Sequence, residues 1–227
     1  MTWVSVFTRF LRSRNFPLPP AHMAWVASLL ATTGFAGDAQ PFTIERPGRA
    51  IRIRVYDYAR VSPAVLERAK ASASEILEQA GIPLEWVECR IRPEDPPQDR
   101  ACELPGTPLD LYLHILDQDM AKAAGGSDCL GFALLAEGFD STASVNFHRA
   151  LELESESQGS RAAILGAVMA HEIGHLLLDQ SSHAANGIMR AQWDVQDLKR
   201  ISEGRVWFTV EQASRIASQV AQRERAQ

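Results

Sequence analysis

The sequence has 227 residues, of which 46% are hydrophobic, so the chain is long and apolar enough to bury a sizeable core and is not disordered throughout. Its 23 basic and 28 acidic side chains give a formal net charge of −5 at pH 7. This acidic balance argues against nucleic acids and anionic membrane surfaces as partners.

The first 39 residues differ in composition from the rest. Three arginines, the last at Arg14, precede an apolar run from Met23 to Ala36, and small residues follow. This order predicts a signal peptide or leader over residues 1–39, cleaved after Ala36 or Ala39, and a single domain over residues 40–227. The apolar run is shorter than the roughly 20 residues of a spanning helix. We therefore expect a secreted or periplasmic protein with no stable membrane insertion after leader removal; a membrane anchor, if the leader is retained, and a start at Met23 are the alternatives.

Three cysteines, Cys89, Cys102 and Cys129, are an odd number for an exported chain, and no two of them form the CxxC pair of a metal ribbon. We favour a disulfide between Cys89 and Cys102, which would close a Pro-rich loop and leave Cys129 as a buried thiol. A disulfide through Cys129 is the alternative, because spacing does not fix connectivity.

The N-terminal half of the domain predicts a strand, a helix and a second strand. Residues 51–59 alternate apolar and polar side chains, as a strand with one buried face does. A helix follows, with Ser62 as its cap and Gly81 at its end, and the strand pattern resumes at 82–89. This order predicts a right-handed βαβ unit with two parallel strands.

The C-terminal half predicts three more strands and then helices. The strands are expected at 109–116, 130–136 and 142–148. An acidic stretch at 152–160 precedes an almost wholly apolar segment, which predicts a buried helix over 161–178. A turn at "NGIM", a short helix from Trp193 to about Ile201 and a last helix from 209 to about 222 complete the chain. The expected fold is α/β (α+β): a five-stranded mixed sheet with a backing helix, a histidine-bearing active-site helix and a small C-terminal helical part.

The segment "HEIGH" at 171–175 carries the chemistry. Residues four apart share one face of a helix, so His171 and His175 can present imidazole nitrogens to one metal ion. Glu172 projects beside that position, where a general base for zinc-activated water must stand. The alternative is a buried helix whose ionisable side chains are merely hydrogen-bonded, but three such residues in an apolar helix are costly without partners.

This segment resembles the metzincin clan of zinc metallopeptidases, whose motif is HExxHxxGxxH followed by a methionine-containing turn beneath the zinc. "HEIGH" matches, a third histidine follows at His183, and "GIM" at 187–189 supplies a candidate Met-turn with Met189. The order of elements is similar over most of residues 50–222, although only residues 171–189 are specific. The resemblance implies Zn²⁺ bound by His171, His175 and His183, with Met189 supporting the site.

Two positions depart from that pattern. The glycine and the third ligand of the clan fall on Leu178 and Ser181 here, and His183 comes two residues late. A bend at Asp179 would return His183 to the metal, because aspartate tolerates left-handed backbone better than most residues; Asp179 as a ligand is the alternative. The tyrosine that some metzincins carry two residues after the methionine is replaced by Ala191.

The resemblance also implies an antiparallel edge strand that holds the substrate, here Cys129 to Ala136 with Gly131, Phe132 and Ala133 at its centre. The expected function is thus an exported zinc metalloendopeptidase that acts on a protein or peptide substrate, with Glu172 as general base. The alternatives are a non-catalytic exported zinc-binding module of the same fold and a zinc amidohydrolase acting on a non-peptide substrate.

The remaining histidines and aromatic residues are assigned to structure. His114, within a strand, and His148, at a strand end, are expected to be structural histidines. Trp193, Trp207 and Phe208 are expected to pack the C-terminal part or to line a specificity pocket downstream of the Met-turn.

Overall fold

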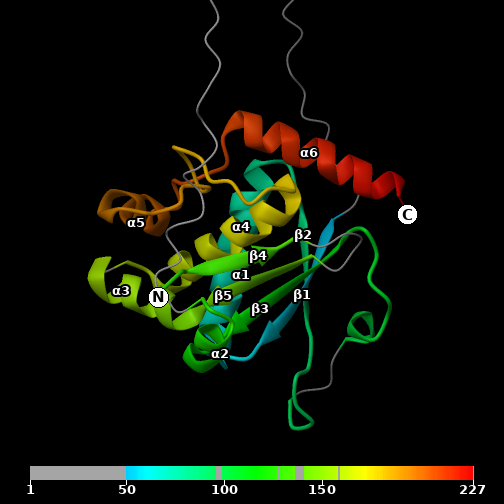
Figure 1. The fold of residues 1–227 in the computed structure, drawn as a ribbon, viewed down its shortest axis with the longest axis horizontal. Helices are drawn as coiled ribbons and strands as arrows, with labels where there is room; N and C mark the ends of the chain where they lie inside the picture. Colours follow the sequence, from blue (N-terminus) through cyan, green and yellow to red (C-terminus); the bar gives the residue numbers. More distant parts are fainter. Residues whose placement is uncertain (1–49, 96–98, 127, 136–140, 158, 227) are drawn as a thin grey trace, which may run out of the picture. The chain divides into compact units, whose positions relative to one another are not determined.

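Alternating apolar residues form five strands of one mixed sheet in the computed structural model (Figure 1). The strand order is β2-β1-β3-β5-β4, and all neighbouring strands are parallel except β4 and β5. The strands are β1 (Ile51–Asp57), β2 (Leu84–Glu88), β3 (Asp110–Leu116), β4 (Gly131–Leu134) and β5 (Thr142–Asn146). The predicted α/β class with a five-stranded mixed sheet and its parallel βαβ unit is confirmed.

The structure describes residues 50–95, 99–126, 128–135, 141–157 and 159–226, which belong to one unit, Phe42–Gln227. The predicted leader at residues 1–39 lies outside the described residues, and so does the end of the expected strand at Ala136. Both stay predictions.

Two long helices cover one face of the sheet. They are α1 (Pro63–Gln79) and α4 (Arg161–Leu178), which pack closely on one another. Alternate residues of β1, namely Ile51, Ile53 and Val55, are at most 1% exposed and face these helices. The predicted start and end of α1 are confirmed, although the Ser62 side chain makes no capping hydrogen bond.

The segment after β5 differs from the expectation. Residues 147 and 148, expected to end a strand, begin helix α3 (Phe147–Ser157), and this helix takes in most of the predicted acidic stretch. Its apolar positions Phe147, Ala150 and Leu153 have helical spacing and contact the core. The Asn146 side chain accepts a hydrogen bond from the Arg149 backbone N–H and so turns the chain out of the strand.

The C-terminal helices are α5 (Val195–Ser202) and α6 (Val210–Arg225), and Thr209 and Gln212 form a capping box at the start of α6. Arg223 of α6 donates to the carbonyl oxygen of Leu176 at 2.9 Å, and Arg215 donates to that of Leu178 at 3.5 Å. These two cations lie at the carbonyl end of α4, where they complement the helix dipole. A short α2 (Gln118–Ala123), capped by Asp117, was not expected from the sequence.

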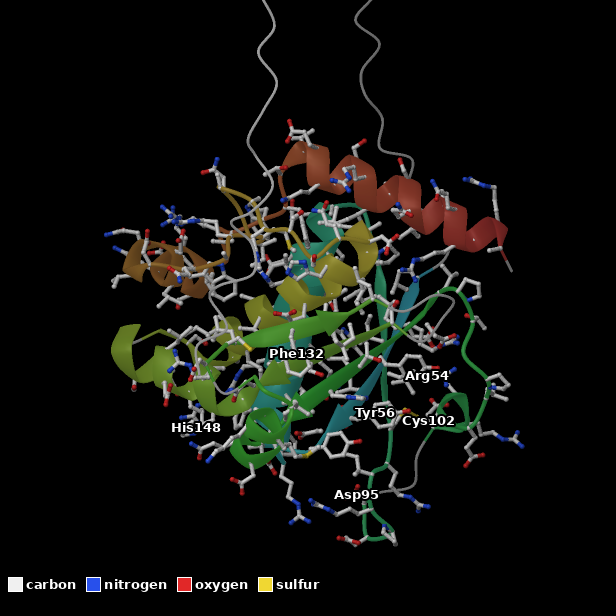
Figure 2. The ribbon with its side chains drawn as sticks, viewed as in Figure 1. Arg54, Tyr56, Asp95, Cys102, Phe132 and His148 are labelled. Atoms are coloured by element: carbon white, nitrogen blue, oxygen red, sulfur yellow. A yellow bond between two sulfur atoms is a disulfide. The ribbon has the colours of Figure 1, made fainter. Side chains whose placement is uncertain are left out.

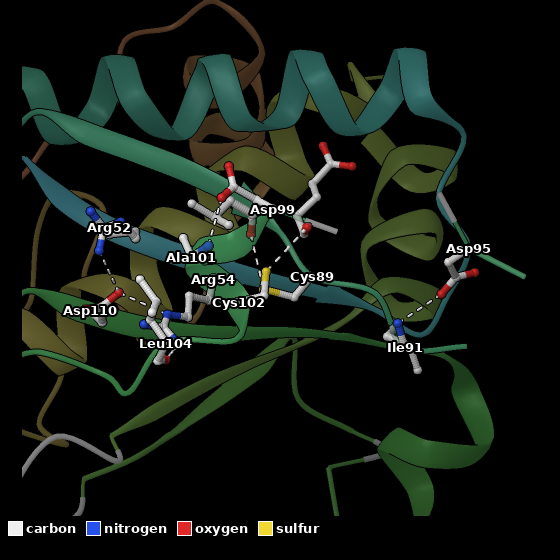
Figure 3. Close-up of a disulfide and its surroundings, with 12 residues drawn as sticks. Arg52, Arg54, Cys89, Ile91, Asp95, Asp99, Ala101, Cys102, Leu104 and Asp110 are labelled. Carbon is white, nitrogen blue, oxygen red and sulfur yellow. Dashed lines mark hydrogen bonds and ion pairs between the residues drawn. A yellow bond between two sulfur atoms is a disulfide. The ribbon is translucent and has the colours of Figure 1, made fainter. Parts of the chain in front are cut away.

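The loop between β2 and β3 lies against the other face of the sheet, and Figure 3 shows the disulfide that closes it. Cys89 and Cys102 form this disulfide as predicted, and Cys102 belongs to the short helix η1 (Arg100–Cys102). Cys129 is a free thiol, as expected, but it is half-buried and not buried. Arg54 lies between the sheet and this loop and donates to Asp110 at 3.0 Å. Figure 2 shows Arg54 and Tyr56 on the same side of the sheet as this loop.

Candidate metal centre

Helix α4 presents the candidate site from the centre of the domain. It runs from Arg161 to Leu178, between the cap residue Ser160 and Asp179, and every residue from Ile164 to Leu178 is buried. The helix is long and apolar enough to cross a membrane, but 89% of it is buried within the domain. Its apolar surface is thus accounted for by the core, and the few polar side chains it carries are the ones that need an explanation.

His171 and His175 point their imidazole rings at one another from successive turns of α4. The Nδ1 atom of His171 lies 2.8 Å from the carbonyl oxygen of Ile188, and the Nδ1 atom of His175 lies 2.8 Å from that of Gln180. A carbonyl oxygen only accepts, so each Nδ1 donates its proton and each Nε2 is left with a free lone pair. The two Nε2 atoms are 3.1 Å apart.

Two lone pairs facing one another at this distance repel, because neither nitrogen has a proton to share. A cation between them removes the repulsion. Zinc–imidazole bonds of about 2.0–2.1 Å in tetrahedral geometry place two ligating nitrogens about 3.3 Å apart, close to the observed 3.1 Å. Carbonyl acceptors on the far nitrogens are the usual outer partners of zinc-bound histidines. The donor set therefore fits a zinc ion.

Burial keeps both rings neutral. Desolvation lowers the pKa of His171 to about 4, against a smaller opposing effect of its hydrogen bond to Ile188. The pKa of His175 is also lowered, chiefly by burial. Neutral imidazole is the form that binds metal, so the site is prepared for a cation at neutral pH without first losing a proton.

The chain bends back at Asp179 and brings His183 to the same place. Asp179 adopts left-handed backbone angles, φ 50° and ψ 48°, as the sequence predicted. The His183 ring lies 5.3 Å from that of His171 and 4.9 Å from that of His175, centroid to centroid. One nitrogen from each of the three histidines lies within 4.8 Å of the other two, and among the described residues Asp179 is not part of this cluster. His183 is exposed, so its side of the cluster is open to solvent.

A turn at residues 184–190 closes the floor of the site. Ala184 N–H donates to the Met189 carbonyl oxygen at 2.8 Å, and Gly187 takes the positive φ of 75° that the turn requires. Met189 is fully buried. A Cβ added at Gly174 would lie 2.7 Å from the Met189 sulfur, so only glycine allows this approach beneath α4. Met189 thus packs against the helix that carries the histidines, and its role in a Met-turn stays a prediction.

Glu172 is buried beside the histidines without a hydrogen-bonding partner for its Oε2 atom in the described part of the chain. It is 4% exposed, and burial raises the pKa of its carboxyl to about 8. A buried carboxyl oxygen without a partner is costly in a folded core. Such a group near neutral pKa is suited to take up and release a proton.

Strand β4 lies against Glu172 at the edge of the sheet. A Cβ added at Gly131 would lie 2.7 Å from both Cγ and Oε1 of Glu172. There is therefore no room for a side chain between the backbone of the strand and the carboxyl. Among the described residues β4 pairs with β5 alone, in antiparallel register. Gly131, Phe132 and Ala133 are thus at the antiparallel edge where they were expected.

Two residues that the sequence analysis did not place next to "HEIGH" lie beside it in the folded chain. The Trp193 ring meets the His171 ring edge to face at 5.8 Å between centroids. Cys129 lies near Glu172, and burial, followed by that carboxylate, raises the pKa of its thiol. Their spacing from "HEIGH" follows no periodicity, so only the folded chain brings them there.

The other histidines stay away from the cluster, as expected. His114 lies between the Tyr56 and Tyr58 rings at 5.3 and 5.8 Å, and burial lowers its pKa. His148 pairs with Glu152 on α3. Neither belongs to the described group of potential ligands.

A hollow of about 440 Å³ lies beside the turn, where Gly187 and Arg190, the residues around Met189, form part of its lining. Arg190, Trp207 and Phe208 are among the residues that line it. Neither the three histidines nor Glu172 is among its lining residues, and the specificity pocket expected downstream of the turn stays a prediction.

The chain was compared with protein families, curated proteins and solved structures. No protein-family model matches the sequence, and no curated protein matches it. Among solved structures the chain is similar to a zinc-dependent peptidase from Methanocorpusculum labreanum (strain Z), with 18% sequence identity and a TM-score of 0.45. The likeness covers 72% of this chain and 99% of that one.

Proposed function

We propose that the protein is a zinc-dependent metalloendopeptidase of the metzincin type. The observation that carries the proposal is the convergence of three histidines on one point, with the rings of His171 and His175 held as metal ligands by carbonyl acceptors. The buried Glu172 carboxyl, whose Oε2 atom has no hydrogen-bonding partner among the described residues, lies beside that point. A merely structural metal site has no use for such a carboxyl and closes its fourth position with protein.

The histidines hold the metal and Glu172 moves protons. A bound zinc ion supplies Lewis acidity, which lowers the pKa of water to about 7 and polarises a carbonyl group. Glu172 accepts the proton of the attacking water and passes it to the departing amine of the cleaved peptide bond. Its pKa of about 8 in the metal-free chain is that of a group able to do both near neutral pH.

The substrate is a protein or peptide segment in extended form. Among the described residues no strand pairs with the outer edge of β4, which lies directly beside Glu172, and an extended peptide can add to such an edge through backbone hydrogen bonds. A small non-peptide amide would need no strand of this kind.

Metal analysis and a protease assay on the same preparation test the proposal. We expect about one zinc per chain and cleavage of denatured casein that a chelator abolishes and added zinc restores. Glu172→Gln should keep the zinc and lose the activity, whereas Glu78→Gln, a control on the exposed face of α1, should keep both. A zinc-loaded wild type that leaves casein intact would point to a non-catalytic module instead.

We also propose that the protein is exported. The basic, apolar and small-residue order of residues 1–39 supports this, and so does the Cys89–Cys102 disulfide, because disulfides persist in oxidising compartments. The mass of the protein recovered from the cell exterior or periplasm tests it: loss of the leader is expected, and a full-length chain in the cytoplasm would contradict it.

A further inference from the structure

The free edge of β4 presents the backbone groups of alternate residues. The Asn146 N–H donates to the Leu130 carbonyl oxygen at 2.8 Å, and these two residues are opposite one another in the register with β5. In an antiparallel pair such bonded positions alternate with non-bonded ones. Gly131 and Ala133 are therefore non-bonded positions, and their N–H and C=O groups point away from β5, toward whatever lies along the edge.

The side chains of β4 alternate between the two faces of the sheet. Gly131 and Ala133 are on the face covered by α4, so Phe132 and Leu134 are on the opposite face. Leu134 is 60% exposed, and Leu135, which follows it, is 39% exposed. Figure 2 shows Phe132 on the same side of the sheet as Arg54 and Tyr56.

In the part of the chain that the structure describes, this edge lacks the protection that exposed strands usually have. Natural sheets guard their edges with charged residues, proline or a covering segment. The segment "LGFALL" at 130–135 contains neither a charged residue nor a proline. A single exposed leucine is ordinary on a protein surface, but a pairing edge with apolar side chains and no charge is suited to receive a strand of matching apolar character.

We propose that the site selects extended peptides that carry large apolar side chains at two alternate positions, which pack on Phe132 and Leu134. The proposal rests on the peptidase function proposed above and names the substrate class of the same site. In an added strand, directly opposite residues project to the same face. The apolar residues of the substrate are thus one and three positions away from the residue opposite Gly131.

Gly131 connects this surface to the chemistry. Because its Cα approaches Glu172 so closely, the substrate residue opposite Gly131 lies beside the carboxyl and next to the bond that is cleaved. The intervening substrate residue, opposite Ala133, projects toward the side of α4. This continuity with the site favours a peptide substrate over a second copy of the chain as the occupant of the edge.

Two labelled octapeptides of identical composition test the proposal. In one, two leucines are separated by one polar residue; in the other, they are adjacent. Binding to zinc-loaded Glu172→Gln is measured by fluorescence anisotropy. We expect the alternating peptide to bind at least about tenfold more tightly, as burial of one or two leucine side chains implies. Adding Leu134→Ser should remove the difference, whereas Leu104→Ser should keep it, since Leu104 is equally exposed at 60% but lies outside β4.

Cleavage and oligomeric state complete the test. Wild type should cleave the alternating peptide at a bond within three residues of a leucine, as located by mass spectrometry. Equal binding of the two peptides, or no binding of either, would overturn the proposal even if casein is cleaved. The same binding preference without any cleavage would uphold the peptide surface and reject the peptidase function. A dimer in sedimentation that Leu134→Ser dissociates would assign the edge to a second copy of the chain and overturn the proposal.

Discussion

Replacement of Glu172 by glutamine should make the metal-free protein more stable while it destroys the activity. Glutamine has the shape of a protonated glutamate, so the packing beside Gly131 is kept. The difference between the two proteins is the work of neutralising a carboxyl that is 4% exposed and lacks a partner for Oε2 among the described residues. Only the wild type has this free-energy cost of protonating the carboxyl on folding, because glutamine does not ionise.

The magnitude follows from the pKa of Glu172, which burial raises from 4.5 to about 8 in the folded chain. Because the folded pKa is the higher one, folding takes up a proton, and wild-type stability is lost as the pH rises from about 4.5 to about 8. At about 1.4 kcal/mol per pKa unit, the loss at pH 7 is about 3 kcal/mol. Glu172→Gln does not suffer this loss. His171 and His175 titrate in both proteins, so their effect cancels in the difference.

Urea unfolding of both metal-free proteins between pH 5 and pH 8 measures this directly. We expect the two free energies of unfolding to agree within about 1 kcal/mol at pH 5 and to diverge as the pH rises, with the variant more stable. With zinc bound, the nearby cation favours the ionised carboxyl, so the divergence should shrink. A difference that does not change with pH would show that Glu172 is solvated in the folded protein and would refute the reasoning.

Three further results are expected. Gly131→Ala should lower kcat for peptide substrates by at least about tenfold, because the new Cβ would lie 2.7 Å from Glu172 and 2.6 Å from the Ser144 carbonyl oxygen; kinetics equal to wild type would show that the carboxyl moves aside freely. His183→Ala should weaken zinc binding by at least about tenfold in a chelator competition, since one of three nitrogen ligands is lost, and unchanged affinity would remove His183 from the site. Asp179→Gly should keep the zinc affinity within about threefold and cost less than about 1 kcal/mol in thermal unfolding, because glycine accepts the left-handed φ of 50°; a loss as large as that of His183→Ala would make Asp179 a ligand.

The sequence alone determined the parts of the site that depend on neighbours along the chain. The i, i+4 spacing of His171 and His175 puts both on one helix face wherever that helix is packed. The bounds of α4 agree with the predicted range, because an apolar segment between a serine cap and a left-handed aspartate specifies them locally. The tolerance of aspartate for left-handed backbone predicted the bend at Asp179 for the same reason.

Local pattern failed where two local signals competed. The segment from Phe147 onward has both a strand-like start and helical spacing, and its run of glutamates looked like a lead-in to the next helix. The hydrogen bond from the Arg149 N–H to the Asn146 side chain favours a helix over a continued strand from Phe147 onward. That contact forms only once the strand before it is in place.

Tertiary structure decided everything that joins distant segments. Gly131 approaches Glu172 only because β4 pairs with β5 as the outermost described strand of the sheet. Trp193 contacts His171 only because of the way the chain folds after Met189. The carbonyl oxygens of Ile188 and Gln180 that orient the two imidazole rings are backbone atoms, which every residue type possesses. The type of a residue does not reveal which partner its backbone carbonyl will have. The residues of "HEIGH" therefore specify which side chains can bind a metal. Only the packed chain fixes the tautomers of the two histidines and brings the edge of β4 beside them.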